Sequence, residues 1–232
     1  MPCGVGGEAL GCKIVTAFSN NSQLGLPSVM ANILLHDPNT GQLKIILEGN
    51  TLTGLRTAAA SVVATKELHS GEKCRLAILG AGIQAKAHAF ALNHAFKFKE
   101  NEKAKKLVEE LRAECLTDGT DFQVSSTAEQ CVRDADVICT TTYASEPILH
   151  FEWIKPGVHI NAVGAGVNHH SELDTRTYQN SVVVTDSMAS ASEELKGLAN
   201  IGVPVYAEIG QIINKTVKIP KTHCTIFHSL GR

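Results

Sequence analysis

Three small residues at fixed spacing carry the clearest chemical signal in this sequence of 232 residues. Gly80, Gly82 and Ala85 lie in LAILGAGIQAKAHA, where a short apolar run enters a glycine turn and then a stretch with helical spacing. In such a turn the first glycine permits the tight bend, the second lets the backbone approach a pyrophosphate, and a small third residue allows the helix to pack on the strand. The first N–H groups of the helix point at the phosphate, whose charge the helix dipole favours. The segment predicts a dinucleotide-binding βαβ unit, with a plain tight turn as the alternative.

A second strand should follow this loop and end about 20 residues on, in an acidic residue for NAD or in basic and polar residues for NADP. Glu102 lies near that distance, but the only apolar stretch shortly before it is at 95–98. We therefore expect that strand to be absent, with a helix over 84–96 running almost directly into a helix over 101–115. In KFKENEKAKKLVEELRAE, acidic and basic residues interleave at helical spacing, which favours a solvated helix face over a basic patch.

The rest of the chain shows two different periodicities. The apolar runs VMANILLHD and LKIILEG flank the turn residues PNTGQ and predict a β-hairpin over 28–47, with KIVTAF as a third strand. A helix capped by Thr51 or Thr53 should follow and end near Ser70 and Gly71. Beyond that boundary the short apolar segments CRLAIL, FQVSS, VICTTT, HINAVGA and SVVVTDS alternate with helices or loops. This alternation predicts an α/β fold with a parallel sheet covered on both faces.

Composition and charge exclude several classes of partner. The net charge of -2 gives no field that would attract nucleic acid or an anionic membrane. No apolar run approaches the roughly 20 residues that span a bilayer, and the first residues lack the features of a signal peptide. The 7 cysteines form no CxxC pair, so we interpret them as reduced core residues and expect a cytoplasmic protein. His169 and His170 are adjacent and lack a matching ligand cluster, so no metal is expected.

Several separated motifs together indicate a known family. GNTLTGLRTAAASVVATKEL, LAILGAGIQAKAHA, ADVICTTTYASEPIL, GVHINAVGA and IFHSLG occur in this order along nearly the whole chain. The combination resembles the ornithine cyclodeaminase and mu-crystallin family. The resemblance implies a homodimer, with a Rossmann-type domain that holds a nicotinamide cofactor and a smaller α+β domain for dimerisation and substrate. We expect the smaller domain over 1–70, the Rossmann-type domain over 71–205, and a return segment to the first domain over 206–232.

The resemblance also implies chemistry and residue roles. Some family members reduce cyclic ketimines with NADPH or NADH, others convert ornithine to proline with bound NAD, and some bind thyroid hormone. By this matching Lys13 is the substrate-site lysine, Arg56 holds the substrate carboxylate or lies near the cofactor, and Asp186 transfers a proton near the substrate nitrogen. The residues that would contact the cofactor, besides Arg56, are Gly80, Ala81, Gly82, Ile83, Gln84, Thr142, Val163 and Ser229.

These roles agree with what the reaction needs. Hydride addition to a C=N bond works best on the protonated iminium, so the site requires a cation for the carboxylate, an acid and a dry pocket. The arginine fork suits a carboxylate because it donates two parallel hydrogen bonds. From the residues alone, Lys13 could be a surface lysine at a strand end, Arg56 a helix surface charge, and Asp186 a helix N-cap.

The chain departs from the family pattern in three places, as judged from the sequence. An N-terminal helix and strand and a long C-terminal helix are expected to be missing, so the chain should be shortened at both ends. The internal strand after Phe98 should be missing as well, which would leave unpaired N–H and C=O groups in the sheet. The sequence thus favours a ketimine reductase. An ornithine cyclodeaminase-like enzyme and a non-catalytic crystallin or thyroid-hormone-binding protein are the alternatives.

Overall fold

The computed structural model describes residues 2–72, 74–98, 100–103, 121–164 and 170–231. The chain divides into two compact units, Met1–Arg56 and Thr57–Arg232. The division falls within helix α1 (Asn50–Leu68) and differs from the boundary near Gly71 expected from the sequence. The reason is that the C-terminal half of α1 packs on the second unit, where Ala64 and Leu68 share an apolar cluster with Phe227.

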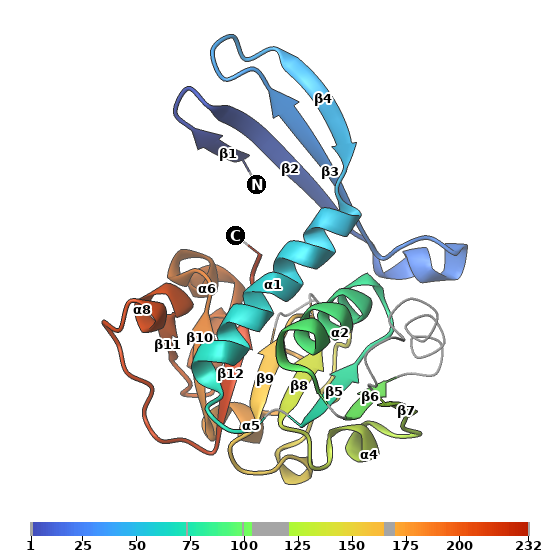
Figure 1. The fold of residues 1–232 in the computed structure, drawn as a ribbon, viewed down its shortest axis with the longest axis vertical. Coiled ribbons are helices and arrows are strands. Elements are labelled where there is room, and N and C mark those ends of the chain that lie inside the picture. Colours follow the sequence, from blue (N-terminus) through green and yellow to red (C-terminus); the bar gives the residue numbers. More distant parts are fainter. Residues whose placement is uncertain (1, 73, 99, 104–120, 165–169, 232) are drawn as a thin grey trace. The chain divides into compact units, whose positions relative to one another are not determined.

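The first unit is a four-stranded antiparallel sheet, in the order β1-β2-β3-β4 (Figure 1). The predicted hairpin and third strand are present. In the turn of the hairpin, Asp37 accepts hydrogen bonds from the backbone N–H groups of Asn39 and Thr40, and Gly41 has a φ of 72°. The elements are β1 (Pro2–Val5), β2 (Ala9–Ala17), the 3₁₀ helix η1 (Ser19–Leu24), β3 (Val29–His36) and β4 (Leu43–Glu48).

Helix α1 begins before the two threonines that were expected to cap it. Asn50 is its first residue, so Thr51 and Thr53 lie inside the helix. The Asn50 side chain instead accepts a hydrogen bond from the backbone N–H of Ala31 at 2.7 Å, which ties the start of the helix to β3. The predicted end near Ser70 agrees with the observed last residue, Leu68, within the usual uncertainty of helix ends.

The second unit contains an eight-stranded sheet, in the order β11-β10-β12-β9-β8-β5-β6-β7, in which neighbouring strands are parallel (Figure 1). This confirms the predicted α/β fold with a Rossmann-type parallel sheet. The strands are β5 (Arg75–Leu79), β6 (Glu100–Lys103), β7 (Asp121–Val124), β8 (Val137–Thr140), β9 (His159–Ala162), β10 (Ser181–Thr185), β11 (Val205–Glu208) and β12 (Cys224–His228). The described helices are α2 (Ile83–Phe96), α4 (Ala128–Val132), η2 (Phe151–Trp153), α5 (Thr175–Gln179), α6 (Met188–Glu194), α7 (Lys196–Asn200) and α8 (Ile209–Ile213).

Both faces of this sheet are buried, as the alternation of its side chains shows. On β5, Leu76 and Ile78 pack in a cluster with residues of α2, whereas Ala77 and Leu79 belong to the cluster on the opposite face. Successive side chains of a strand point to opposite faces, so two covered faces require apolar residues at nearly every position. This explains the continuous apolar runs in β5, β8 and β10.

The strand that was expected to be missing is present, and that expectation is wrong. β6 pairs in parallel with β5 on one side and β7 on the other, with Leu76 opposite Asn101. Its sequence, ENEK, has no apolar period, and strand propensity depends strongly on the neighbouring strands. The four residues also correct the start of the helix expected over 101–115, whose remaining part lies outside the described residues.

The segment 206–232 also differs from its expected role as a return to the first domain. Within it, β12 lies between β9 and β10, and Ile226 pairs with Ile160 and Val183. The run CTIFH was not among the predicted strands, and its partners are far away in the sequence. Tertiary pairing therefore decides its place in the sheet.

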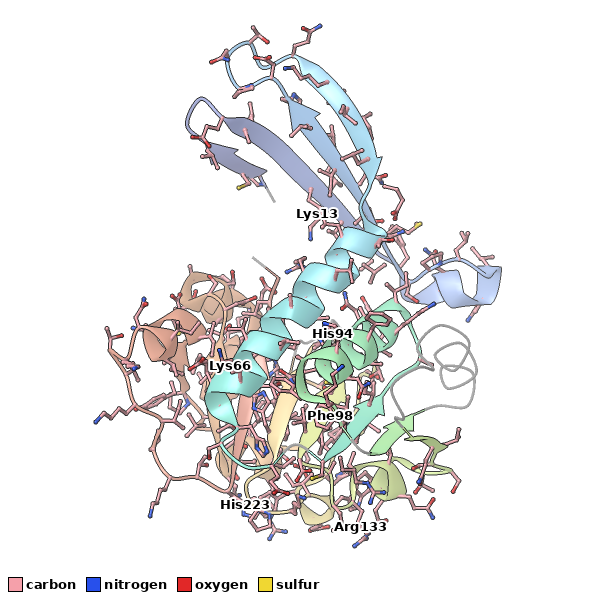
Figure 2. All side chains as sticks on the ribbon, in the orientation of Figure 1. Lys13, Lys66, His94, Phe98, Arg133 and His223 are labelled. Carbon is pink, nitrogen blue, oxygen red and sulfur yellow. The ribbon has the colours of Figure 1, made fainter. Side chains whose placement is uncertain are left out.

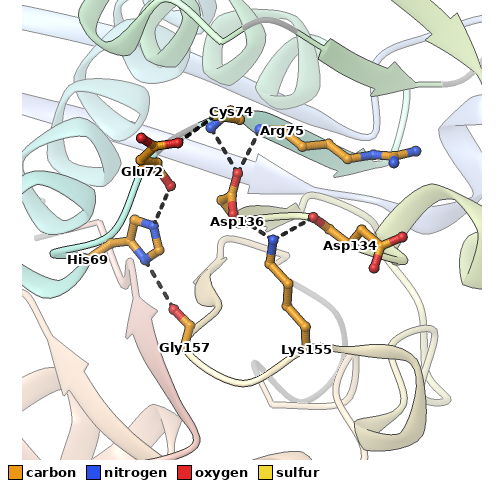
Figure 3. Close-up of polar contacts among 8 residues, drawn as sticks. All are labelled: His69, Glu72, Cys74, Arg75, Asp134, Asp136, Lys155 and Gly157. Carbon is orange, nitrogen blue, oxygen red and sulfur yellow. Dashed lines mark hydrogen bonds and ion pairs between the residues drawn. The ribbon is translucent and has the colours of Figure 1, made fainter.

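A polar network closes the amino-terminal ends of β5 and β8, on the edge opposite the glycine turn (Figure 3). The Asp136 carboxylate accepts hydrogen bonds from the backbone N–H groups of Cys74 and Arg75, and the Lys155 ammonium donates to it at 2.6 Å. These bonds, led by the one from Lys155, hold the pKa of Asp136 below its usual value although burial opposes them. The network fixes the start of β5. Because the glycine turn follows the other end of this strand, the network also helps to fix the position of the turn.

Candidate active site

The glycine turn has the shape that a pyrophosphate requires. Gly80 follows β5 with a φ of 131°, and a Cβ there would lie 2.3 Å from the Thr141 Oγ1 atom. At Gly82 a Cβ would meet nothing within 4 Å, so the space beside this backbone is open. Gly82 is the N-cap of α2, a helix of 14 residues, and supplies no side-chain hydrogen bond to its first N–H groups. Open backbone and uncapped N–H groups fit a bound phosphate.

The turn lies where the order of the strands changes direction. β5 stands between β6 and β8, so the chain first builds the sheet to one side of β5 and later to the other. In open parallel sheets ligands bind at the carboxyl ends of strands beside such a switch point. The predicted loop therefore lies at the expected position for a dinucleotide.

Backbone hydrogen bonds join the carboxyl ends of four strands next to this loop. The N–H of Thr141 donates to the Leu79 carbonyl at 2.9 Å, which ties the residue after β8 to the end of β5. The N–H of Val163 donates to the Thr140 carbonyl at 2.9 Å. The N–H of Ser229 donates to the carbonyl of Ala162 at 3.2 Å. Predicted residues after β5, β8, β9 and β12 are thus brought to one edge of the sheet.

Two side chains of this edge carry polar atoms that lack partners among the described residues. The Ser229 hydroxyl is buried and unpaired, in a residue that is only 7% exposed, and the Gln84 carbonyl oxygen Oε1 is likewise buried and unpaired. Buried polar groups are nearly always satisfied, so an unpaired one needs a specific reason. A bound polar molecule would supply it. Ala81 and Ile83 are exposed on the turn, with Ile83 at 46%.

Asp186 lies at the same edge, directly after β10. Its carboxylate accepts hydrogen bonds from the backbone N–H groups of Leu230 at 3.1 Å and Gly231 at 2.9 Å. It therefore anchors the segment that contains Ser229. The N-cap alternative for Asp186 is wrong, because the Ser187 side chain caps α6 by accepting from the N–H of Ser190.

The sequence analysis missed the most buried carboxylate beside these loops. Glu172 is 1% exposed, and its carboxylate accepts hydrogen bonds from the backbone N–H and the hydroxyl of Thr142 and from the backbone N–H of Gly164. Burial raises the pKa of Glu172, and the hydrogen bonds partly oppose that shift. No local sequence signal marks this residue, because acidic residues lie mostly on the surface and only the folded structure shows its burial.

Lys13 and Arg56 belong to the first unit. Lys13 lies on β2 (labelled in Figure 2) and donates to the Thr53 hydroxyl at 3.4 Å. Burial lowers the pKa of Lys13, and the positive charge of Arg56 lowers it further. Two neighbouring positive charges on one unit would favour an anionic ligand. Whether Asp186 and the cofactor residues of the second unit meet these cations stays a prediction.

No cluster of three or more potential ligands for a metal ion occurs within the described part of the chain. His169 lies outside that part, so the expectation for His169 and His170 is not tested. The described helices include none that is both long and apolar enough to cross a membrane.

These features define an α/β protein with a Rossmann-type sheet and a dinucleotide-binding edge. The sequence matches the ornithine cyclodeaminase/mu-crystallin family over residues 1–232, and the chain belongs to this family.

Individual relatives agree with that assignment. Ketimine reductase mu-crystallin of Mus musculus is 39% identical over 224 residues, which are 97% of this chain and 72% of the relative. Among solved structures, Thermococcus litoralis Delta(1)-pyrroline-2-carboxylate reductase in complex with NADH and L-proline superimposes with a TM-score of 0.87 and 32% identity, over 97% of this chain and 74% of the other. An archaeal alanine dehydrogenase dimer with bound NAD superimposes with a TM-score of 0.85 and 31% sequence identity, over 100% of this chain and 75% of the other.

Proposed function

We propose that this protein reduces cyclic ketimines to cyclic amino acids with NADH or NADPH. The observation that carries the proposal is the continuous edge formed by β5, β8, β9 and β12, with an open glycine turn at the switch point. The names of the relatives support the reaction, because they include a ketimine reductase and a pyrroline-2-carboxylate reductase whose structure holds NADH and L-proline.

In this proposal the edge of the sheet binds the cofactor. The backbone from Gly80 to Gln84 receives the pyrophosphate, while Thr142 and Val163 line the cofactor side and Ser229 reaches the nicotinamide end. The nicotinamide, when bound, supplies the hydride that adds to the carbon of the C=N bond. A dry position next to Ser229 suits this step because excluding water strengthens the fixed charges around the reacting bond.

The charged residues would handle the substrate. Arg56 holds its carboxylate with two parallel hydrogen bonds, and Lys13 adds a second positive charge beside Arg56. Asp186 would keep a proton near the substrate nitrogen, so that hydride meets an iminium rather than a neutral imine. The backbone N–H groups of Leu230 and Gly231 donate to its carboxylate and hold that side chain in place.

The first test is an assay of the purified chain with a cyclic ketimine and NADH or NADPH, followed by the absorbance of the reduced cofactor. We expect oxidation of the cofactor by the wild-type protein. Arg56→Ala should lower kcat/KM by about 30-fold or more, since truncating one partner of a desolvated charge pair costs at least about 2 kcal/mol. Arg176→Ala is the matched control, because Arg176 is 59% exposed and pairs with Glu152 on the surface. Equal rates for wild type and Arg56→Ala would overturn the catalytic proposal.

The same preparation distinguishes the two alternatives. Ornithine-dependent release of ammonia with bound NAD, and no ketimine reduction, would indicate an ornithine cyclodeaminase-like enzyme. Binding of thyroid hormone without turnover of either substrate would indicate a binding protein. We further propose a cytoplasmic homodimer joined through the first unit.

A further inference from the structure

The buried carboxylate of Glu172 connects two loops that the proposed cofactor site uses. One oxygen, Oε1, accepts from the N–H of Thr142 at 2.6 Å and from the Thr142 hydroxyl at 2.7 Å. The other oxygen, Oε2, accepts from the N–H of Gly164 at 3.0 Å. Thr142 follows β8 and Gly164 follows β9, so a single side chain holds the ends of two neighbouring strands.

The backbone of Glu172 is itself held in place. Its carbonyl accepts hydrogen bonds from the N–H groups of Ile148 at 2.8 Å and Leu149 at 3.0 Å. Leu149 forms a parallel bridge with Leu173, and both residues are buried in the core of the second unit. The backbone of Glu172 is therefore fixed by the core of the second unit, and its carboxylate extends from there to the two loops.

Gly164 is shaped to admit this carboxylate. A Cβ at Gly164 would lie 2.1 Å from the Glu172 Cδ atom, so any other residue would displace the carboxyl group. The two positions thus form a matched pair. The backbone conformation of Gly164 does not require glycine. The close approach of the Glu172 carboxyl group does.

An ionised group is not what stability alone would select at this position. Burial raises the pKa of Glu172, which means that the charged form is penalised by its surroundings. A structural contact could be made by an apolar side chain without that penalty. The carboxylate, however, is the side chain that accepts on two oxygens at once, as the donors on two separate loops require.

We propose that Glu172 is a positioning residue that sets the loops after β8 and β9 for the cofactor. It acts through Thr142 and through the backbone of Val163 and Gly164, and it does not touch the reacting atoms. This inference rests on the proposed function, since it assigns a role within the same cofactor site.

The test compares Glu172→Gln with wild type. An amide carries one acceptor oxygen, so one of the two loops would face an NH₂ group instead. We expect the dissociation constant of NADH, measured by fluorescence titration, to rise about tenfold, the effect of losing one charge-assisted hydrogen bond. The KM for the cofactor should rise in parallel, while kcat at saturating cofactor should change less than about threefold, because the lost interaction acts on binding. Glu152→Gln is the control, since Glu152 is a surface residue whose side chain is 73% exposed.

A double-mutant cycle protects the test against a general loss of stability. Gly164→Ala should weaken NADH binding in the wild-type background, because the added methyl displaces the carboxylate. The same change should have little further effect in a Glu172→Ala background, where nothing is left to displace. Additive effects of the two changes on NADH binding would overturn the inference.

The outcomes separate the inference from the function on which it rests. If the wild-type chain binds NADH and Glu172→Gln binds it equally well, the positioning role is wrong and the proposed function stands. If the wild-type chain binds neither NADH nor NADPH, both fall. Should Glu172→Gln fail to fold, Thr142→Val is the second variant, because it removes the hydroxyl that donates to Glu172 and that also accepts from the backbone N–H of Ala144. Unchanged NADH binding in Thr142→Val would then contradict the role.

Discussion

At the scale of single residues, His88 shows how the environment chooses a protonation state. Its Nδ1 atom lies 2.8 Å from the carbonyl oxygen of Gln84, which can only accept, so Nδ1 carries the proton. Nε2 then accepts from the hydroxyl of Ser61 at 2.9 Å. Burial lowers the pKa of His88 to about 4, so the ring is neutral at physiological pH. The residue joins α1 to α2 as a neutral hydrogen-bonding group.

His88 should make the stability of the protein depend on pH. Its pKa is lower in the folded chain than the 6.5 of an unperturbed histidine, so the unfolded chain binds the proton first. The contribution of His88 to the free energy of unfolding is then fully present above pH 6.5. It is lost as the pH decreases toward 4, which lowers the free energy of unfolding by about 3 kcal/mol. Urea unfolding of wild type and His88→Gln between pH 4 and pH 7 should show the smaller decline in the variant. His94→Gln, on the exposed side of the same helix (Figure 2), should behave as wild type. Parallel profiles for wild type and His88→Gln would contradict this account.

Residue chemistry also explains why Glu172 escaped the sequence analysis. An acid near the end of an irregular segment has the same local appearance as a surface acid. Its burial, its donors and the missing Cβ at Gly164 come from parts of the chain that meet only in the folded sheet.

At the scale of elements, the glycine turn between β5 and α2 contains two glycines with different roles. Gly80 has a φ of 131°, and a Cβ there would also lie 2.9 Å from the Thr141 carbonyl oxygen. Gly82 has a φ of -88° at the N-cap of α2, which any residue can adopt, and its surroundings are open. The first glycine therefore belongs to the fold, and the second keeps space for the ligand.

Substitution by alanine should separate the structural role of Gly80 from the ligand-binding role of Gly82. Gly80→Ala should lower the free energy of unfolding by about 2 kcal/mol or more, because it combines an unfavourable φ with a backbone clash. Gly82→Ala should change it by less than about 0.5 kcal/mol, as expected for an open surface position. It should nevertheless weaken NADH binding by about tenfold or more, because the methyl group occupies the approach of the phosphate. Urea unfolding and fluorescence titration measure the two quantities. NADH binding by Gly82→Ala at wild-type strength would show that the phosphate does not lie there.

At the scale of the whole molecule, the sheet of the first unit carries exposed apolar side chains. On β4 the neighbouring residues Ile46 and Leu47 are 62% and 46% exposed, although their side chains point to opposite faces. On β2, Ile14 is 50% exposed. Apolar residues exposed on both faces of a sheet indicate an interaction surface. Under the proposed homodimer, a second copy of the chain would cover these residues.

The assembly can be tested at one exposed position. Sedimentation velocity should give the mass of two chains for the wild-type protein. Ile46→Glu should shift the distribution toward one chain, since a buried unpaired charge costs several kcal/mol at an interface. Val124→Glu is the control, because Val124 is 47% exposed on β7 of the second unit. A wild-type monomer, or an Ile46→Glu dimer of undiminished stability, would contradict the proposed interface.

The sequence by itself determined the α/β class, the hairpin of the first unit and the glycine turn, because each depends on residues close together in the chain. Periodicity placed β5, β8, β9 and β10, and motif spacing named the family. Only the tertiary structure decided that the polar segment β6 completes the sheet, that β12 lies between β9 and β10, and that Glu172 joins two loops. Hydrogen bonds between distant strands and the burial of a charge are properties of the assembled sheet, and no local pattern of residue types specifies them.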